Sequence, residues 1–314
     1  MKNGYNDFLN IVEKYLEEHK YDPNINLTTN VLNPFIDYYK KQDIPISEYN
    51  KQSFDDYFKT VCGTPSSSMT TKTSLARIFK NLGLEEVSEV IRSADKSFKT
   101  NYFRDFDALD KGIEQVRFEK FYSIEGAPTD CPCDTFTMGQ VILYLAWIGV
   151  PKRLLTQMPL SSINLEEQYV DGGKKYSFAD NPKIAEIFEK YKNSDTYVGL
   201  NVKKDKVFFR TNTYQGDTLI RTRSKPTGSN INITTTLNRI KTTFEDESYN
   251  YYNVFRSGQF YRGFQKITSG ILPEYDDADA LWEYFRIQLD TEDAIRMFDI
   301  EWKTYLKWRQ GSTE

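Results

Sequence analysis

The sequence predicts a mostly α-helical protein of two domains with one small β-sheet. At 314 residues the chain is long enough to form two hydrophobic cores. Apolar residues recur at spacings of three and four through much of the first 125 residues, which indicates amphipathic helices. Alternating apolar residues around Asp171-Gly172-Gly173 instead predict a β-hairpin. Helical patterns dominate the remainder, so the sheet is expected to be small.

The composition indicates a folded globular chain. Hydrophobic residues make up 39% of the sequence and aromatic residues 15%, which argues against disorder. No window approaches the roughly twenty consecutive apolar residues of a membrane span, so we expect no membrane partner. The first residues alternate charges with an apolar helical stripe and lack the apolar core of a signal peptide. We therefore expect a cytoplasmic protein.

The cysteines predict neither a disulfide framework nor a metal site. There are three, Cys62, Cys131 and Cys133, which is an odd number and too few for a framework. The Cys131-Pro132-Cys133 motif lacks the second ligand pair or nearby histidine that a zinc site needs. We predict no metal and no cofactor.

The net charge of −4 conceals an uneven distribution. Residues 200–244 contain nine Lys/Arg against two Asp/Glu, whereas residues 271–301 contain ten Asp/Glu against two arginines. DNA binding depends on cationic side chains that displace counterions from phosphate, so the first segment is a candidate DNA-binding surface. The second could dock on a basic surface of another protomer, which predicts self-association. A solvated face is the alternative interpretation of the basic segment.

The first 125 residues are expected to form a small all-helical domain. Predicted helices run from about 5 to 19, 53 to 61, 70 to 83 and 84 to 93. A turn-rich break, Gly63-Thr64-Pro65, separates the second from the third. Residues 126–136, with Pro128 and Pro132, have the composition of an interdomain linker.

Residues 137–314 are expected to form the second, larger domain. An apolar helix from Thr137 breaks at Gly149-Val150-Pro151, and a second helix is predicted to begin with Lys152 and Arg153. Residues 160–165 lead into a strand, and the hairpin of residues 169–178 follows. Asn181-Pro182 opens a helix to residue 192, and residues 233–244 form another.

Residues 137–165 resemble the opening of the catalytic domain of tyrosine recombinases, the phage-integrase superfamily. That opening has an apolar helix, a Gly-Leu-Arg motif, a Leu-rich helix and a Trp-Ser-Asp-Ile-Asp-Leu tail, which the sequence LSSINL at 160–165 matches closely. Val207-Phe208-Phe209-Arg210 resembles a later Leu-Phe-Pro-Ser segment of the family. The resemblance implies a two-domain clamp in which a helical, SAM-like core-binding domain and a catalytic-fold domain close on duplex DNA.

Family members cleave DNA with a tyrosine nucleophile, two arginines that clamp the phosphate, and a lysine and histidines that assist proton transfer. Counting back from the 160–165 tail places the first arginine on Pro151. The His-x-x-Arg element falls on residues 253–256, where Arg256 matches but Asn253 replaces the histidine. An amide cannot act as a general acid or base at that position.

The nucleophile and the late His/Trp position are less well matched. Tyr305 is the better candidate for the nucleophile, with Phe298 as the other residue that falls near the position. Trp282 is the candidate for the His/Trp position. The loss of one clamp or acid–base group costs roughly 10²–10⁴ in rate. The resemblance therefore implies a degenerate member that is not an enzyme, with an active divergent recombinase using Tyr305 as the alternative.

The groups that hold phosphate are retained, so the expected partner is double-stranded DNA. The overall layout and these losses resemble the master lysogeny repressors of SPβ-like temperate phages. That resemblance implies a prophage-encoded repressor of lytic genes that binds operator-like elements in its bacterial host. A protein–protein interaction module is a third alternative. The expected DNA-binding residues are Lys152, Arg153, Lys174, Lys175, Arg210, Arg221, Arg223, Lys225, Arg256 and Arg262.

Overall fold

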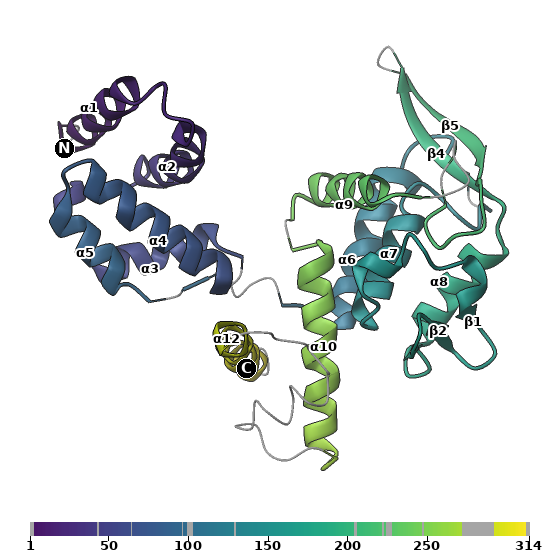
Figure 1. The fold of residues 1–314 in the computed structure, drawn as a ribbon. Coiled ribbons are helices and arrows are strands. Elements are labelled where there is room, and N and C mark those ends of the chain that lie inside the picture. The colour runs from purple at the N-terminus through teal and green to yellow at the C-terminus, as the bar shows by residue number, and fades with distance from the viewer. Residues whose placement is uncertain are drawn as a thin grey trace. The chain divides into compact units, whose positions relative to one another are not determined.

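A computed structural model describes residues 3–42, 44–63, 65–95, 97–98, 103–128, 130–203, 206–221, 223, 228–246, 248–271 and 292–311. Among them the chain is mostly helical, with a small amount of antiparallel sheet, as the sequence predicts. It divides into two compact units, one of Met1–Thr100 with Gln288–Glu314 and one of Asn101–Ile287 (Figure 1). These boundaries differ from the expected ranges of 1–125 and 137–314.

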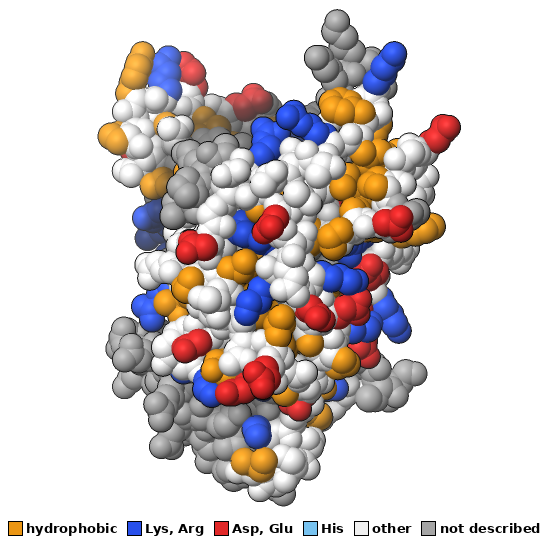
Figure 2. Space-filling model, turned by 90° about the vertical axis from the view of Figure 1, so that its right-hand side faces the viewer, with side chains coloured by type: hydrophobic (Ala, Val, Ile, Leu, Met, Phe, Trp, Pro, Cys, Tyr) orange, Lys and Arg blue, Asp and Glu red, His pale blue; other side chains and the backbone are white. Residues whose placement is uncertain are grey.

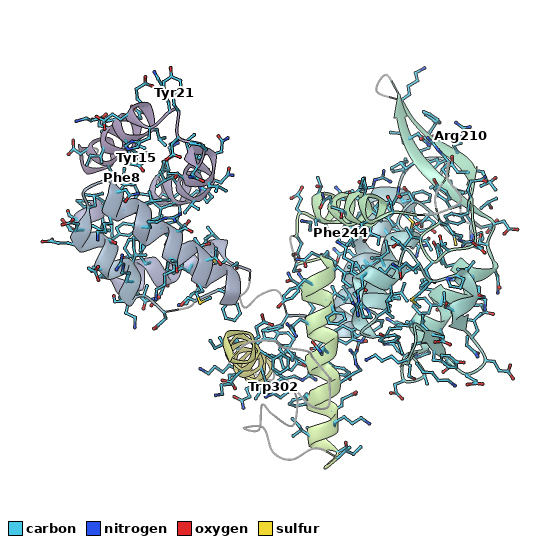
Figure 3. All side chains as sticks on the ribbon, viewed as in Figure 1. Phe8, Tyr15, Tyr21, Arg210, Phe244 and Trp302 are labelled. Atoms are coloured by element: carbon cyan, nitrogen blue, oxygen red, sulfur yellow. The ribbon has the colours of Figure 1, made fainter. Side chains whose placement is uncertain are left out.

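The first unit is a helical bundle with an aromatic core. Phe35 lies at its centre and forms ring pairs with Phe8, Tyr57 and Phe79 at centroid distances of 5.1–5.9 Å. Phe8 reaches this core from the first helix (Figure 3). Edge-to-face and offset ring pairs stabilise beyond the area that they bury. Its helices are α1 (Asn3–Glu18), α2 (Ile25–Tyr39), α3 (Lys51–Val61), α4 (Pro65–Asn81), α5 (Glu85–Ser93) and α12 (Glu292–Gly311), with the short 3₁₀ helix η1 (Ile46–Glu48).

The C-terminal helix α12 packs on α4 within this unit. Phe298, Trp302 and Tyr305 share one face of the helix at spacings of four and three, and each is at most 2% exposed. Trp302 and Tyr305 stack with ring centroids 5.7 Å apart. Helix α12 therefore contributes to the same core as the helices of residues 3–93.

The second unit contains the remaining helices and every strand in the described residues. The helices are α6 (Phe106–Arg117), α7 (Thr137–Trp147), α8 (Pro182–Asn193), α9 (Asn230–Phe244) and α10 (Tyr251–Thr268), with a π-helical turn η2 (Phe118–Tyr122) and 3₁₀ turns η3 (Lys152–Leu154) and η4 (Leu160–Ser162). The strands β1 (Ile163–Asn164), β2 (Tyr169–Asp171) and β3 (Lys175–Ser177) form one antiparallel sheet. The strands β4 (Thr196–Lys203) and β5 (Lys206–Thr213) form a separate ribbon.

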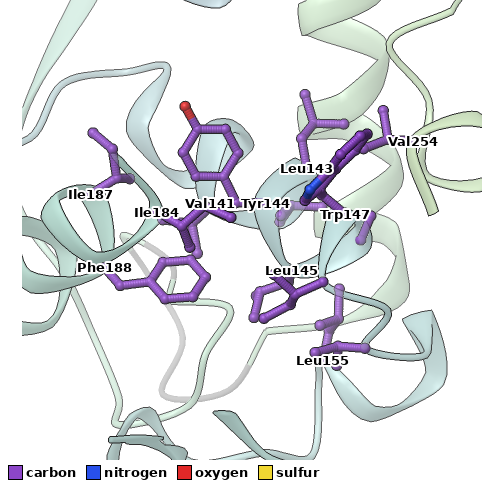
Figure 4. Packing of buried hydrophobic residues seen from close by; sticks show 14 of the residues in the cluster. Val141, Leu143, Tyr144, Leu145, Trp147, Leu155, Ile184, Ile187, Phe188 and Val254 are labelled. Atoms are coloured by element: carbon purple, nitrogen blue, oxygen red, sulfur yellow. The ribbon is translucent and has the colours of Figure 1, made fainter. Parts of the chain in front are cut away.

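Helix α7 is the centre of the second unit because it is apolar on all sides. Its side chains from Val141 to Trp147 are at most 5% exposed and pack against α8, α9 and α10 (Figure 4). A Cβ on Gly258 would lie 2.1 Å from the carbonyl oxygen of Trp147. Only glycine therefore permits the close crossing of α10 over α7.

Two predicted elements are confirmed by local structure. The hairpin of residues 169–178 is present as β2 and β3, paired from Tyr169↔Ser177 to Asp171↔Lys175. Helix α8 begins at Pro182, and the side chain of Asn181 caps it by accepting a hydrogen bond from the backbone of Ile184 at 3.4 Å.

Three other predictions are wrong in detail. The helix expected at Lys152 is only the 3₁₀ turn η3. The residues that follow it form turns, and these turns bury the side chains of Leu155 and Met158 in the core. The expected linker is packed into the second unit, where Cys133 and Asp134 are at most 1% exposed. The long ribbon of β4 and β5 stands where a short segment was expected around residues 207–210.

Candidate nucleic-acid interface

A pocket of about 540 Å³ lies where residues from η3, α9 and the start of α10 meet. We call it the η3 pocket. Lys152, Arg153 and Lys241 contribute positive charge to it, and no Asp or Glu lines it. Its remaining lining residues are Pro151, Thr234, Leu237, Asn238, Asn250, Tyr251, Tyr252 and Phe255. Because all its charged lining residues are cations, the electrostatics of this concavity favour an anionic ligand.

Local packing holds the two exposed cations of η3 in place. Pro151 has φ −64° and ψ 134°, an extended conformation from which the 3₁₀ turn starts. The hydroxyl of Tyr251, on α10, donates a hydrogen bond to the carbonyl of Val150. Burial raises the pKa of this hydroxyl, so it remains a donor at physiological pH. The side chains of Lys152 and Arg153 face solvent from this anchored turn.

The hairpin turn adds a fourth cation through Tyr176. The ammonium of Lys174 lies 5.0 Å from the centre of the Tyr176 ring. Burial raises the pKa of the Tyr176 hydroxyl, and the positive charge of Arg153 partly offsets this effect. Lys174 therefore lies on Tyr176, whose hydroxyl is also influenced by the charge of Arg153.

Lys175, its neighbour, faces the other way. Its ammonium is 2.9 Å from a carboxylate oxygen of Glu167 and 4.1 Å from the ring centre of Tyr169. Lys175 begins β3 on its exposed face, opposite the buried Tyr176, whereas Lys174 precedes the strand in the turn. The ion pair with Glu167 partly neutralises the charge of Lys175.

Arg256 lies next to the η3 pocket without lining it. Its guanidinium donates to Gln259 Oε1 at 2.8 Å and to the hydroxyl of Tyr252 at 3.2 Å, and Tyr252 is a lining residue. Asn253, which the resemblance to tyrosine recombinases aligns with a histidine, is only 7% exposed. The structure therefore places Arg256 beside Lys152 and Arg153 through one tyrosine.

Two predicted DNA-binding arginines are structural in this fold. Arg221 is 3% exposed, lies between the rings of Tyr191 and Tyr214, and donates to the carbonyls of Ser194 and Tyr191. Arg262 donates to the carbonyl of Trp147 at the end of α7, where a cation stabilises the negative end of the helix dipole. Both guanidinium groups are held by backbone carbonyls of the second unit, and Arg221 is buried as well.

The remaining predicted residues lie apart from the η3 pocket. Arg210 is exposed on the β4–β5 ribbon (Figure 3), and Arg223 lines another concavity described below. Lys225 lies outside the described residues. On the ribbon, Val207 is 47% exposed and Phe208 is 42% exposed. Figure 2 shows that hydrophobic side chains gather over this ribbon, while Lys/Arg and Asp/Glu side chains are interspersed over the rest of that face.

Helix α9 connects the η3 pocket to a second basic concavity. Thr234, Asn238 and Lys241 line the η3 pocket from one side of the helix. From the other side, Arg239 and Thr243 line a concavity of about 600 Å³ that also holds Arg223 and Lys120, with Glu119 as its acidic member. Helix α9 contains no Asp or Glu, and Ser229 caps its N-terminus by accepting from the backbone of Asn232 at 3.4 Å.

Sequence reasoning included α9 in the basic segment of residues 200–244 but did not single out its exposed Thr- and Asn-rich face. Its exposed residues are Asn230, Ile231, Thr234, Thr235, Asn238, Arg239 and Thr242. The signal in the sequence was available: fifteen residues with two cations, no acid and an unusual density of Thr and Asn. Helix α4 of the first unit has the same character, with no acid and with Thr70, Thr73, Arg77 and Lys80 exposed.

The candidate nucleophile, Tyr305, is enclosed in the core of the first unit. It is 1% exposed, between Trp302 and Trp308. Phe298 is 2% exposed on the same helix. Trp282 lies outside the described residues, as does most of the acidic segment of residues 271–301.

Other kinds of site are not found in the described part of the chain. No group of three or more His, Cys, Asp or Glu side chains is placed to hold a metal ion there. Among the described helices, none is long and apolar enough to cross a membrane. No protein-family model matches the chain, and no curated protein matches it significantly.

Proposed function

We propose that this protein is a sequence-specific, non-cleaving DNA-binding repressor of phage lytic genes, built on a tyrosine recombinase fold that has lost its chemistry. The observation that carries the proposal is the η3 pocket. It combines Lys152, Arg153 and Lys241 with the neighbouring Arg256, and it has Pro151 where the family has its first arginine. Cations that hold phosphate are present there without the groups that cleave it.

The phosphate contacts come from the exposed cations around the pocket. Lys152 and Arg153 line the η3 pocket, Lys174 is exposed on the hairpin turn, and Arg223 and Arg239 line the concavity on the other side of α9. Each phosphate that such a cation neutralises releases counterions and strengthens binding without regard to sequence. These contacts set affinity and the register of the protein on the duplex.

Helix α9 supplies the base contacts in this proposal. Thr234, Asn238 and Arg239 project from a helix without acidic residues, so phosphates on either side would not be repelled. Asparagine forms paired hydrogen bonds with adenine and arginine with guanine in the major groove, whereas threonine contacts the methyl group of thymine. The exposed Thr and Arg residues of α4 give the helical unit a comparable face.

Three positions support the loss of chemistry. Pro151 has no cationic side chain, and Asn253 is buried and carries an amide, which cannot act as a general acid or base. Tyr305 is packed in the helical core, where a phosphodiester cannot approach its hydroxyl without unpacking α12. A recombinase needs all of these groups at one phosphate.

The finer parts of the proposal follow from this function. The two units act as a clamp on duplex DNA, the protein works in the cytoplasm of the bacterial host, and it binds operator-like elements of the phage. Self-association through the acidic segment of residues 271–301 would place two copies on paired sites, because that segment complements the basic face in charge.

The test combines binding and chemistry in one set of samples. Fragmented phage DNA is incubated with the full chain, run on a native gel and then, unheated, in SDS. A shift of a few fragments with nothing surviving SDS supports the proposal. A Lys152→Ala/Arg153→Ala variant should lose the shift, whereas Lys190→Ala, which removes an exposed α8 cation paired with Glu186, should keep it. An SDS-resistant adduct that disappears in Tyr305→Phe would replace the repressor with an active recombinase.

A further inference from the structure

A smaller and more enclosed pocket lies between α9 and the residues that follow the β4–β5 ribbon. Its volume is about 220 Å³. Three arginines, Arg221, Arg223 and Arg239, line it together with Tyr214 and Thr235. We call it the Arg221 pocket. It is separate from the η3 pocket and shares no lining residue with it.

Arg221 makes this pocket unusual because its charge is buried without an acid. No carboxylate of the described residues lies within 4 Å of its guanidinium, which instead contacts two carbonyls and two tyrosine rings. Its Nε–H is buried and has no hydrogen-bond partner. A buried cation without a counterion and a buried donor without an acceptor both cost free energy. An anion that reached this guanidinium from the pocket would offset the unpaired charge and could accept from the Nε–H.

The one acidic lining residue does not supply that anion. Asp134 is fully buried, and its carboxylate accepts from Arg117 Nε at 2.5 Å and from the backbone of Phe136 and Thr137. Its charge is therefore already balanced within the core. Arg223 and Arg239 add two further cations at the exposed side of the pocket. The charges that line the pocket therefore give it a positive electrostatic potential.

The size of the pocket indicates a small ligand. Its volume of about 220 Å³ is far above the roughly 10–15 Å³ that one water needs. It is below the roughly 300–1,000 Å³ of pockets that hold drug-sized molecules. A phosphate on the convex surface of a duplex can reach Arg223 and Arg239, but not a guanidinium that is 3% exposed. The ligand is therefore a free molecule.

We propose that the Arg221 pocket binds a small free oxyanion, of the phosphate or carboxylate class, and that its occupancy regulates DNA binding. The regulatory part rests on the proposed function, because Arg239 and Thr235 belong to α9. An anion that holds Arg239 removes one cation from the DNA-facing side of that helix. The binding part depends only on the pocket.

The first experiment tests binding with inorganic phosphate as the probe. Thermal unfolding of the full chain is followed in phosphate and in chloride at equal ionic strength and pH. A saturable increase in the unfolding temperature with phosphate is expected, because a ligand that binds the folded state stabilises it. Phosphate that has no more effect than chloride would overturn the proposal.

The variants locate the effect. Arg221 itself is not substituted, because it also joins α8 to Tyr214 and its loss would disturb folding. Arg223→Ala should weaken phosphate binding about tenfold or more, as expected for the loss of one charge-assisted contact. Arg210→Ala removes an equal charge from the ribbon outside the pocket and should leave phosphate binding unchanged. Equal phosphate affinity in wild type and Arg223→Ala would contradict the assignment.

A second readout separates this inference from the proposed function. DNA affinity is measured with and without saturating phosphate at constant ionic strength, and a severalfold weakening is expected. If the protein binds phosphate but no DNA, the anion-binding assignment of the pocket stands, and both its regulatory role and the proposed function are overturned. DNA binding by a protein that phosphate does not stabilise would overturn the pocket alone.

Discussion

Arg256 donates a hydrogen bond to the hydroxyl of Tyr252 at 3.2 Å, and this tyrosine lines the pocket that contains Lys152 and Arg153. One side-chain contact therefore joins Arg256 to the lining of the pocket that contains Lys152 and Arg153. The sequence places Arg256 more than one hundred residues from Lys152. The packing of α10, which carries Arg256, against α7, which precedes Lys152, brings these two parts of the chain together.

The first prediction concerns the two exposed cations of η3. Substituting both Lys152 and Arg153 with Ala should weaken binding to specific and non-specific DNA alike. The slope of log K against log salt should fall by about 0.9 for each lost phosphate contact. Fluorescence anisotropy over a salt series measures both quantities. A wild-type slope in this variant would remove η3 from the interface, and Lys190→Ala is the control.

The second prediction uses the adjacent lysines of the hairpin as a matched pair. Lys174→Ala should reduce DNA affinity more than Lys175→Ala, because Lys175 is already paired with Glu167. Both substitutions remove one charge from the same turn, so a general electrostatic effect would make them equal. The same anisotropy titration decides between the two outcomes.

The third prediction addresses base recognition by α9. Asn238→Ala should reduce discrimination between operator and random DNA by about 1–3 kcal/mol, because it removes a base contact and no charge. The salt slope should stay at the wild-type value. Competition binding with specific and random duplexes measures the discrimination. Asn193→Ala, at an exposed position of α8, is the matched control, and equal losses in both variants would exclude α9 as the recognition helix.

The fourth prediction separates structural arginines from DNA-binding ones. Arg262→Ala should lower the free energy of unfolding by about 1–2 kcal/mol, because the C-terminal carbonyls of α7 lose a cationic donor. Urea denaturation measures this change. The salt slope of DNA binding should not change, and a reduced slope would return Arg262 to the interface.

The fifth prediction tests the buried ion pair that anchors α7. Asp134→Asn should lower the free energy of unfolding by about 3–5 kcal/mol, because the guanidinium of Arg117 would remain buried without its counterion. Burial by itself lowers the pKa of Arg117, and the charge and hydrogen bond of Asp134, together with Tyr122 and Glu114, more than reverse this effect. Glu114→Gln removes the outer, half-exposed partner of the same arginine and should cost much less. Equal losses would mean that the buried pair contributes no more than the exposed one.

The sequence by itself determined the elements whose signals are local. The Asp-Gly-Gly hairpin, the helix that Asn181 caps and the apolar helix from Thr137 follow from turn chemistry, capping and periodicity within a few residues. The β4–β5 ribbon was missed because it has no Asn-Gly or Asp-Gly turn, and the alternation of its strands is interrupted. Its strand pairing joins residues as far apart as Thr196 and Thr213.

Only the tertiary structure decided what each arginine does. Arg153, Arg221 and Arg262 are the same residue type, and the sequence interpretation assigned all three to DNA binding. Arg221 and Arg262 are held by tyrosine rings and a helix end that approach from elsewhere in the chain, whereas Arg153 is left in solvent. The docking of α12 onto α4, which buries Tyr305, likewise joins residues more than two hundred positions apart. Burial depends on such long-range packing, and no pattern within a short window of sequence records it.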